Sequence, residues 1–572
     1  MREEEGEALM DAGFSAPDRH EPRSAPDRHD PRGVAEVARR LWTSLLLVPA
    51  VDDDAHFFAL GGHSMLATRL MSRLRKAFDA DLPAGLVFEH PVFADFVTHT
   101  VAALSGDWRS VPAAPRPSGR VTGPVSPQQE RLLRIENALG PSPVHNIVVP
   151  LELAAPVDAS LLRSALHTLL TRHGALRLAF PPADKGRGHQ QVIVPPWTPD
   201  DVELVEHPPV GTSARTEDAA VRKAVRRAHL LPFDLTRGNL LRAQVFRRRH
   251  APDLLVLHLH HLAVDGVSQT VLLDDLAEAY THLTAAGRAP HTAGDALTHI
   301  DYALERGAEA GSGAHWRRVV HDLAADLAVQ PEPAPRGVRY ARLSAELDAS
   351  ELRALTGWAG AEAATDFVAV TAAVAAALAG SSGRRRIGIG TLLDNRAHAA
   401  HERTVGPFAN STLLAVPVPD GATPRTVVLA ARDQLAEARR WADTPLDALI
   451  GPPCAALGLH PDDLVDAVVA LDRPYRAPTG STLGLAPLYD HGGPLVRPAL
   501  GPRLAVTLLV QDTGALRITV ECAEDAGDTR GDEGRTRRPE AVLRAVRDML
   551  RLFAVSPDAA LPQPVASSVV PR

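Results

Sequence analysis

The pattern of apolar and polar positions divides the chain into segments of different kinds. Residues 1–32 offer almost no apolar side chains and contain a tandem nonapeptide, SAPDRHEPR followed by SAPDRHDPR, which predicts a disordered tail. From residue 33 to residue 105, apolar residues recur every three or four positions, which is the period of an α-helix. Residues 106–124 are rich in Pro, Gly and Ser and lack this period, so we expect a linker there.

Three amphipathic helices are expected within residues 33–105. The apolar face of the first, VAEVARRLWTSLLL, consists of Val34, Val37, Leu41, Leu45 and Leu46. The second, SMLATRLMSRLRKAF, has an apolar residue at every fourth position: Leu66, Leu70, Leu74 and Phe78. The third, FADFVTHTVAAL, follows Pro91. These helices predict a small bundle of about 70 residues, close to the lower size limit for a domain that folds alone.

The remainder of the chain, residues 125–572, mixes two patterns. A helical pattern at 159–173 is followed by strand-like runs at 254–262, 385–393, 410–418 and 504–512. This mixture predicts an α/β architecture with helices packed on a mixed sheet. The segment is too long for one simple core, so we expect two lobes, 125–330 and 331–572, with the break near QPEPAPRG at 330–337.

Composition narrows the class of protein. With 45% apolar residues, 23% charged residues and a net charge of −8, the chain is typical of globular proteins and a poor candidate for binding nucleic acid. Two cysteines, Cys454 and Cys522, supply neither a disulfide framework nor a thiolate cluster for a metal. The N-terminus lacks the pattern of a secretory signal, and the most apolar stretch, 367–379, is shorter than the roughly 20 residues that cross a bilayer. We therefore expect a cytoplasmic protein with no nucleic-acid or membrane partner and no metal.

The first motif that carries chemistry is FFALGGHSMLATRL at 57–70. On local grounds Ser64 is a helix N-cap, because it lies between a glycine pair and an amphipathic helix. The wider pattern of an acidic loop, two aromatics, LGGHS and an i+4 leucine series resembles the peptidyl or acyl carrier domains of nonribosomal peptide synthetases. The resemblance implies that Ser64 receives 4'-phosphopantetheine from a separate phosphopantetheinyl transferase. The thiol of that arm would hold an acyl group as a thioester, and the N-terminus of a helix suits the phosphate.

The second motif is LHLHHLAVDGVS at 257–268. Strand alternation places Leu255, Leu257, Leu259 and His261 on one face and His258 and His260 on the other. Paired histidines are often structural, and a metal site lacks both HExxH spacing and a third ligand nearby. The pattern HHxxxDG resembles the signature of condensation domains, members of the chloramphenicol-acetyltransferase-like superfamily, and His261 matches their functional histidine.

Further blocks support this second resemblance in chain order. They are SPQQERLL (126–133), RHGALRLAF (172–180), PFDLTRGNLLRAQVF (232–246), IDYALERG (300–307), LLDNR (392–396), VGPFANSTLL (405–414) and ADTPLDAL (442–449). The chain departs from the family pattern at Gly174, at Leu446 and in block 462–474, which puts substrate contacts and lobe closure in doubt. The resemblance implies a multidomain protein: a small all-α four-helix carrier bundle, 33–105, followed by a bilobal α/β condensation domain.

The resemblance also assigns roles to residues. His261 would orient or deprotonate the attacking amine, with His260 beside it in the motif. Asp265 would form a buried salt bridge with an arginine, for which Arg177 is the candidate. The amide of Gly266 is expected at the start of a helix, where it can donate to a developing oxyanion. Arg177, Arg396 and Asn410 are expected to support the site structurally.

Domain order implies the partners. A carrier directly before a condensation domain is expected to hold the donor, so the acceptor would arrive in trans, on another carrier protein or as a free amine or alcohol. The product would be an amide or an ester. We find no adenylation domain, so a separate adenylation protein is expected to load Ser64.

Two alternatives remain from the sequence. Epimerisation domains share HHxxxDG and the DGVS version of it, but His63 stands where carriers that serve them usually have Asp, and no EGHGRE-like motif is present. The second alternative is a noncatalytic condensation-like platform that recruits other enzymes. Intact His261 and Asp265 argue against this interpretation.

Overall fold

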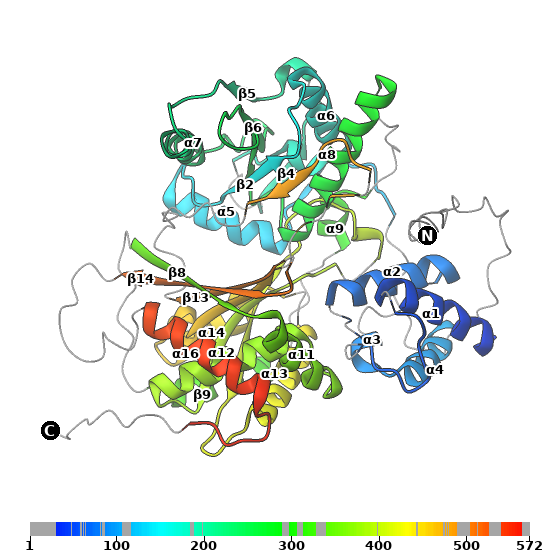
Figure 1. Ribbon diagram of the computed structural model, residues 1–572, viewed down its shortest axis with the longest axis vertical. Coiled ribbons are helices and arrows are strands. Elements are labelled where there is room, and N and C mark those ends of the chain that lie inside the picture. The colour runs from blue at the N-terminus through cyan, green and yellow to red at the C-terminus, as the bar shows by residue number, and fades with distance from the viewer. Residues whose placement is uncertain are drawn as a thin grey trace, which may run out of the picture. The chain divides into compact units, whose positions relative to one another are not determined.

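The chain forms two compact units in the computed structural model (Figure 1). One comprises Met1–Phe57 with Ser64–Pro112, and the other Phe58–His63 with Ala113–Arg572. The structure describes residues 30–562 except for 47, 58–59, 61, 63, 81, 83–85, 106–115, 183–187, 197, 289–296, 306–312, 328–338, 397–398, 442–443, 473–474, 476, 479, 489–503, 512 and 525–538. Most of the predicted tail, most of the predicted linker and the predicted break at 330–337 therefore lie outside the described residues.

The first unit is the predicted bundle of four helices. They are α1 (Pro31–Leu46), α2 (Ser64–Phe78), α3 (Leu86–Glu89) and α4 (Phe93–Leu104). Helix α1 begins two residues earlier than predicted, because Pro31 occupies its first position and the Asp30 carboxylate accepts from the backbone N–H groups of Arg32 and Gly33 at 3.0 and 3.1 Å.

Trp42 lies at the centre of this unit. Its ring is fully buried and contacts Phe57, Phe93 and Phe96, with ring centroids 4.9, 5.2 and 5.5 Å away. The buried face of α1 therefore differs from the predicted one: Trp42 and Ala38 belong to it, whereas Leu41 and Leu46 are only partly buried. On α2 the predicted positions Leu70, Leu74 and Phe78 are buried, together with Met71.

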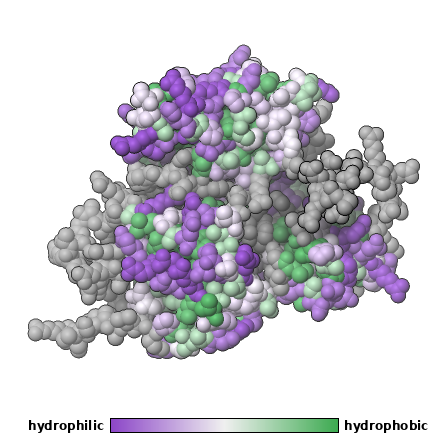
Figure 2. All heavy atoms as spheres, viewed as in Figure 1, coloured by the Kyte–Doolittle hydropathy of each residue, from purple (hydrophilic) through white to green (hydrophobic). Residues whose placement is uncertain are grey.

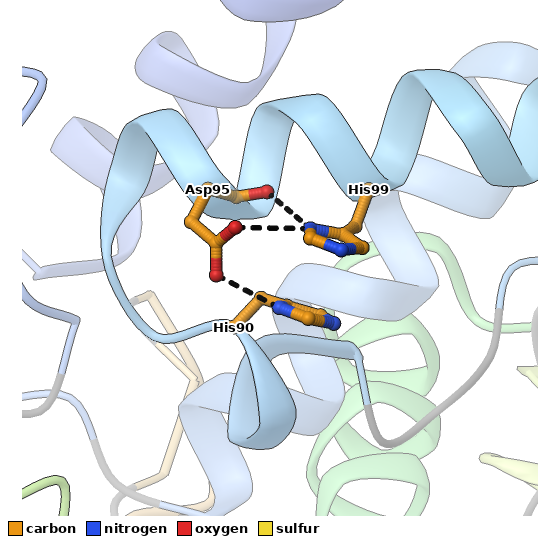
Figure 3. Close-up of side chains that lie close together, drawn as sticks. All are labelled: His90, Asp95 and His99. Carbon is orange, nitrogen blue, oxygen red and sulfur yellow. Dashed lines mark hydrogen bonds and ion pairs between the residues drawn. The ribbon is translucent and has the colours of Figure 1, made fainter.

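A polar cluster joins the end of α3 to α4 (Figure 3). Asp95 accepts from Nδ1 of His90 at 2.8 Å and lies 3.1 Å from Nδ1 of His99. The two imidazoles stack with centroids 3.4 Å apart and planes within 9°. An ion about 2.0–2.1 Å from both Nδ1 atoms would lie far outside at least one of these parallel ring planes. The cluster is therefore a hydrogen-bonded clamp between the two helices.

A five-stranded sheet forms the first half of the second unit, in the order β12-β2-β7-β6-β5. Its strands are β2 (Asn146–Leu153), β5 (Leu204–His207), β6 (Leu241–Phe246), β7 (Leu254–His260) and β12 (Leu485–Pro487). Helices α6 (Ala159–Arg172) and α8 (Gly266–Ala286) share a core with Leu255, Leu257 and Leu259, whereas α7 (Ala214–His229) packs through Val221 against Leu254 and Val256. The predicted alternation along β7 is confirmed, because its odd and even residues enter different cores.

Shorter elements surround this sheet. They are β1 (Thr122–Pro124), α5 (Pro127–Leu139), η1 (Gly174–Arg177), β3 (Leu178–Ala179), β4 (Gln190–Ile193), η2 (Pro199–Asp201) and α9 (His299–Glu305). Helix α10 (Gly313–Ala325) follows them in the chain but packs against the next sheet. Strands β1, β4 and β3 form a separate small sheet. Helix α5 starts with a capping box in which Ser126 and Gln129 exchange hydrogen bonds.

A six-stranded sheet, β10-β9-β11-β13-β14-β8, forms the second half of this unit. Its elements are β8 (Arg339–Leu347), α11 (Ala349–Ala361), α12 (Asp366–Ser382), β9 (Arg386–Leu393), η3 (Ala399–His401), β10 (Asn410–Pro417), α13 (Pro424–Arg439), α14 (Leu446–Ala456), η4 (Pro461–Leu464), β11 (Ala467–Asp472), β13 (Leu504–Val510), β14 (Leu516–Glu524) and α16 (Pro539–Val555). Helices α11, α12, α13 and α16 share the large core of this sheet, and α10 packs with α14 against β10 in another. The visible surface in Figure 2 is largely hydrophilic with scattered apolar residues, as expected for helices that bury one face.

The predicted division into lobes is wrong in two places. Helix α10 belongs to the segment predicted to form the first lobe, but it packs with α14 against β10 of the second sheet. Strand β12 belongs to the segment predicted to form the second lobe, but it pairs antiparallel with β2 in the first sheet. Leu483 and Leu485 enter the core of that sheet, which explains why the segment crosses over. No single described helix is long and apolar enough to span a bilayer; α11 and α12 pass that test only jointly, across a bend of 106°.

Candidate active site

The HHxxxDG motif occupies the turn between β7 and α8. Strand β7 ends at His260 and helix α8 begins at Gly266. Asp265 is the N-cap of α8, because its carboxylate accepts from the backbone N–H of Ser268 at 2.8 Å. The motif residues therefore sit where a strand stops and a helix N-terminus begins.

His261 is held in one tautomer. Its Nδ1 lies 2.9 Å from the carbonyl oxygen of Val264, and a carbonyl can only accept, so Nδ1 carries the proton. The Nε2 atom therefore has a lone pair, and it has no hydrogen-bond partner among the described residues. The backbone N–H of His261 donates to the carbonyl of His145 at 2.9 Å. Desolvation lowers the pKa of His261, so the imidazole is neutral at pH 7 and able to accept a proton at Nε2.

Asp265 forms a buried two-fold contact with Arg396. The distances from Nη1 to Oδ2 and from Nη2 to Oδ1 are 2.9 and 3.0 Å, and both side chains are at most 2% exposed. Burial alone would raise the pKa of Asp265, but the charge and hydrogen bonds of Arg396 outweigh burial and lower it. The backbone N–H groups of Phe408 and Ala409 also donate to this carboxylate, at 3.0 and 3.1 Å.

Arg396 links several segments at this point. Its guanidinium also donates to Asp394 at 2.8 Å and to Ser268 Oγ at 2.9 Å, and it lies 4.1 Å from the centroid of the Phe408 ring. Because residue 396 follows β9 and residue 268 lies on α8, the contact joins the two halves of the second unit.

The predicted pairing of Asp265 with Arg177 is wrong. Arg177 lies in η1, and its guanidinium donates to the carbonyls of Leu170, at 2.7 Å, and Val194. These bonds join α6 to the segment after β4. Asn410 begins β10 and donates from Nδ2 to the carbonyl of Thr444 at 2.7 Å, a contact with the segment before α14. Of the three supporting residues expected from the sequence, Arg396 is the one bonded to Asp265.

Sequence reasoning missed two residues, Glu136 on α5 and His145 before β2. The Glu136 carboxylate lies 2.6 Å from Nδ1 of His145 and 3.4 Å from Nε2 of His260. Burial would raise the pKa of Glu136, but hydrogen bonds from the two histidines lower it to about 2. A signal was present in the sequence: Glu136 follows Leu133 and Gln129 at helical spacing, so it shares their buried face.

Gly266 is exposed at the first position of α8. A Cβ atom built on it meets no atom within 4 Å, so the fold does not require a glycine there. Gly266 therefore leaves open space at its Cβ position, at a helix N-terminus, which favours negative charge.

Ser64 is the first residue of α2, a helix of 15 residues. No acidic residue occurs in the first turn of that helix, so no carboxylate of that turn competes for its backbone N–H groups and dipole. This environment fits a phosphate attached to Ser64. His63 and the Ser64 side chain lie outside the described residues.

The condensation domain family model matches residues 120–470, more than half of the chain. The chain belongs to the condensation-domain family. A second model, for the phosphopantetheine attachment site, matches residues 36–100 and so covers Ser64. The chain is thus a carrier followed by a condensation domain, the arrangement of nonribosomal peptide synthetases, and its cofactor is 4'-phosphopantetheine.

Similar proteins include one of the linear gramicidin synthase proteins of Brevibacillus parabrevis, 30% identical over 73% of this chain, and the probable non-canonical nonribosomal peptide synthetase CymA of Salinispora arenicola, 32% identical over 74%. The chain spans only 5% and 6% of their lengths. Solved structures of the same fold include the first condensation domain of the calcium-dependent antibiotic synthetase, with 20% identity, TM-score 0.60 and coverage of 77% of this chain and 99% of that one. SgcC5 of Streptomyces globisporus has 21% identity, TM-score 0.58 and coverage of 76% and 100%.

Proposed function

We propose that this chain transfers an acyl or peptidyl group carried at Ser64 to an amine or alcohol acceptor supplied in trans, forming an amide or an ester. The phosphopantetheine arm supplies a thiol that holds the acyl group as a thioester. The order of the matched domains, carrier before condensation domain, supports the carrier as the source of the donor. The acceptor arrives on a separate carrier protein or as a free molecule.

The single observation that carries the proposal is the geometry of His261. Amide formation requires an unprotonated amine and a group that takes its proton. The neutral imidazole of His261 has its Nδ1–H bound to Val264, so Nε2 takes the proton as the new bond forms. The pair Asp265–Arg396 fixes the turn that holds this ring and does not itself exchange protons, because it is buried and bonded on both sides.

Gly266 completes the site. As the acyl carbon is attacked, negative charge develops on its carbonyl oxygen. The N–H of Gly266 is placed at the start of α8, beside open space, and donates to that oxygen. No side chain in this scheme acts as a covalent nucleophile, so the acceptor attacks the thioester directly. The carbon–sulfur bond then breaks, and the leaving sulfur would depart as the free thiol with the proton that His261 took up.

Two kinds of partner precede this reaction. A phosphopantetheinyl transferase attaches the arm at Ser64, and an adenylation protein or another synthetase module loads it. We propose that the loading protein is separate from this chain.

Intact-protein mass spectrometry tests the proposal. Holo protein is loaded at Ser64 with an acyl group, and loss of the acyl mass and formation of product are followed as amines, alcohols or aminoacyl carrier proteins are added. We expect acceptor-dependent product with the wild type and none with His261→Ala, while His282→Ala, an exposed histidine on α8, behaves as wild type. A His261→Ala protein with unchanged product formation would establish the platform alternative, and solvent deuterium at the α-carbon without condensation would establish an epimerase. Ser64→Ala must fail to gain the phosphopantetheine mass.

A further inference from the structure

A polar stripe on α5 lies against the turn that holds the catalytic histidine. Gln129 and Glu136, seven residues apart and therefore on one face of the helix, are both buried. Gln129 donates from Nε2 to the carbonyl of Leu262 at 3.4 Å. Glu136 contacts His260, which precedes His261. The stripe thus contacts the HHxxxDG segment on both sides of His261.

The hydrogen bonds around Glu136 give a consistent assignment of protons. The backbone N–H of Leu262 donates to Nδ1 of His260 at 3.2 Å, so Nε2 of His260 carries the proton and donates to Glu136. His145 also donates from Nδ1 to the same carboxylate oxygen, at 2.6 Å. One buried carboxylate therefore accepts from two imidazoles, which fixes the orientation of both rings.

His145 connects Glu136 to His261, because it contacts both residues. Strand β2 pairs with β7 so that Asn146 lies opposite His260, and His145 therefore faces His261. The N–H of His261 donates to the carbonyl of His145 at 2.9 Å, which extends the ladder by one residue beyond the strand. The rings of His145 and His261 are nearly perpendicular, 79° apart, with centroids separated by 6.5 Å.

We propose that Glu136 is a positioning residue for His261, acting through His145 and His260. It does not reach the reacting atoms. Its carboxylate holds the two histidines that flank the backbone of His261, so that the imidazole presents Nε2 to the acceptor in one orientation. The role in transfer rests on the proposed function, whereas the role in holding the turn stands independently of it.

The test compares Glu136→Leu, which removes both acceptors, and Glu136→Gln, which keeps one neutral acceptor oxygen. Glu130→Gln is the matched control, because Glu130 lies on the same helix but is partly exposed and pairs with His189. Hydrogen–deuterium exchange of the peptide covering 260–266 is measured in the full chain, together with the rates of acyl transfer at varied acceptor concentration. Circular dichroism reports whether each variant folds.

We expect faster exchange at 260–266 in Glu136→Leu, an intermediate rate in Glu136→Gln and no change in Glu130→Gln. We expect kcat to fall by up to about 100-fold in Glu136→Leu with little change in KM for the acceptor, because misplacement by about 1 Å costs that much. Partial recovery in Glu136→Gln relative to Glu136→Leu supports positioning.

The two proposals fail in different ways. Unchanged exchange at 260–266 in a folded Glu136→Leu protein overturns the positioning role, even if the wild type transfers acyl groups normally. Faster exchange in a Glu136→Leu protein whose wild-type parent never forms product leaves the positioning role intact and rejects the proposed function. If Glu136→Leu does not fold, the exchange and kcat of Glu136→Gln decide, and values equal to those of the wild type overturn the proposal.

Discussion

Removing Arg396 leaves the carboxylate of Asp265 buried without its cation. In Arg396→Met, Asp265 keeps three backbone donors, from Ser268, Phe408 and Ala409, but loses two bonds of 2.9 and 3.0 Å to the guanidinium. Breaking a buried pair in this way costs about 3–5 kcal/mol, and the three remaining donors favour the lower end. A domain's total stability is about 5–15 kcal/mol, so we expect a large shift of the unfolding curve.

Urea unfolding at pH 7 measures this cost. Unfolding is followed by tryptophan fluorescence. Because the chain has two units, the tryptophans of the first unit would add their own signal to that of the second. The variants are therefore made in a Trp42→Phe/Trp108→Phe background, in which the remaining tryptophans belong to the second unit. The double variant Asp265→Asn/Arg396→Met should be less destabilised than the sum of the two single variants, since it leaves no buried unpaired charge. Because Arg396 holds the pKa of Asp265 below 3.8, the pair's contribution is complete above that pH and is lost as the pH falls further.

A surface arginine provides the matched control. Arg385 pairs with Asp420, and their side chains are 68% and 55% exposed, so Arg385→Met should cost less than about 1 kcal/mol. The reasoning is refuted if Arg396→Met costs no more than Arg385→Met, or if the double variant is as unstable as the sum of its parts.

Three further outcomes follow from the site. The rate of acyl transfer should fall on acidification only below pH 6.5, because burial lowers the pKa of His261 and a protonated Nε2 cannot accept the proton of the acceptor. A fall centred above pH 6.5 would contradict this reasoning. The free energy of unfolding of Gly266→Ala should equal that of the wild type or exceed it by up to about 1 kcal/mol, yet its rate of acyl transfer should be lower. An unchanged rate of transfer would show that substrate does not approach residue 266. Glu136→Gln should weaken the loss of stability between about pH 4.5 and 2, where the wild-type carboxylate is protonated in the unfolded chain but still ionised in the folded one. Acid unfolding curves measure this loss, and parallel curves for the two proteins would contradict the pKa of about 2.

Local patterns predicted the elements well, and long-range packing explains the differences. The i+4 spacing of Leu70, Leu74 and Phe78 fixes the buried face of α2 without reference to other segments. On α1, two faces fit the helical period, and contacts of Trp42 with aromatic rings from other segments decide between them. The position of β12 depends on the unpaired edge of β2, which no local pattern records.

The same division holds for the site. His261, Asp265 and Gly266 share one turn, so their motif predicts their proximity. The partner of Asp265 lies 131 residues away in sequence, and both Arg177 and Arg396 satisfied the requirement for a cation. Arg177 instead donates to backbone carbonyls. Which carbonyls lack a backbone partner depends on the folded path of the chain, so no sequence pattern predicts this contact.

Strand β12 has a consequence for anyone who shortens this protein. Its three residues pair with Leu151, Glu152 and Leu153 at the outer edge of β2, whose sequence NIVVPLEL is rich in β-branched and apolar residues. A chain cut before residue 485 would remove the strand that pairs with residues 151–153 and lengthen the exposed edge of β2, and exposed edges of this kind recruit strands from other molecules. The C-terminal half thus shields the N-terminal half from strand exchange, and excising the lobe that carries His261 would yield an aggregating fragment.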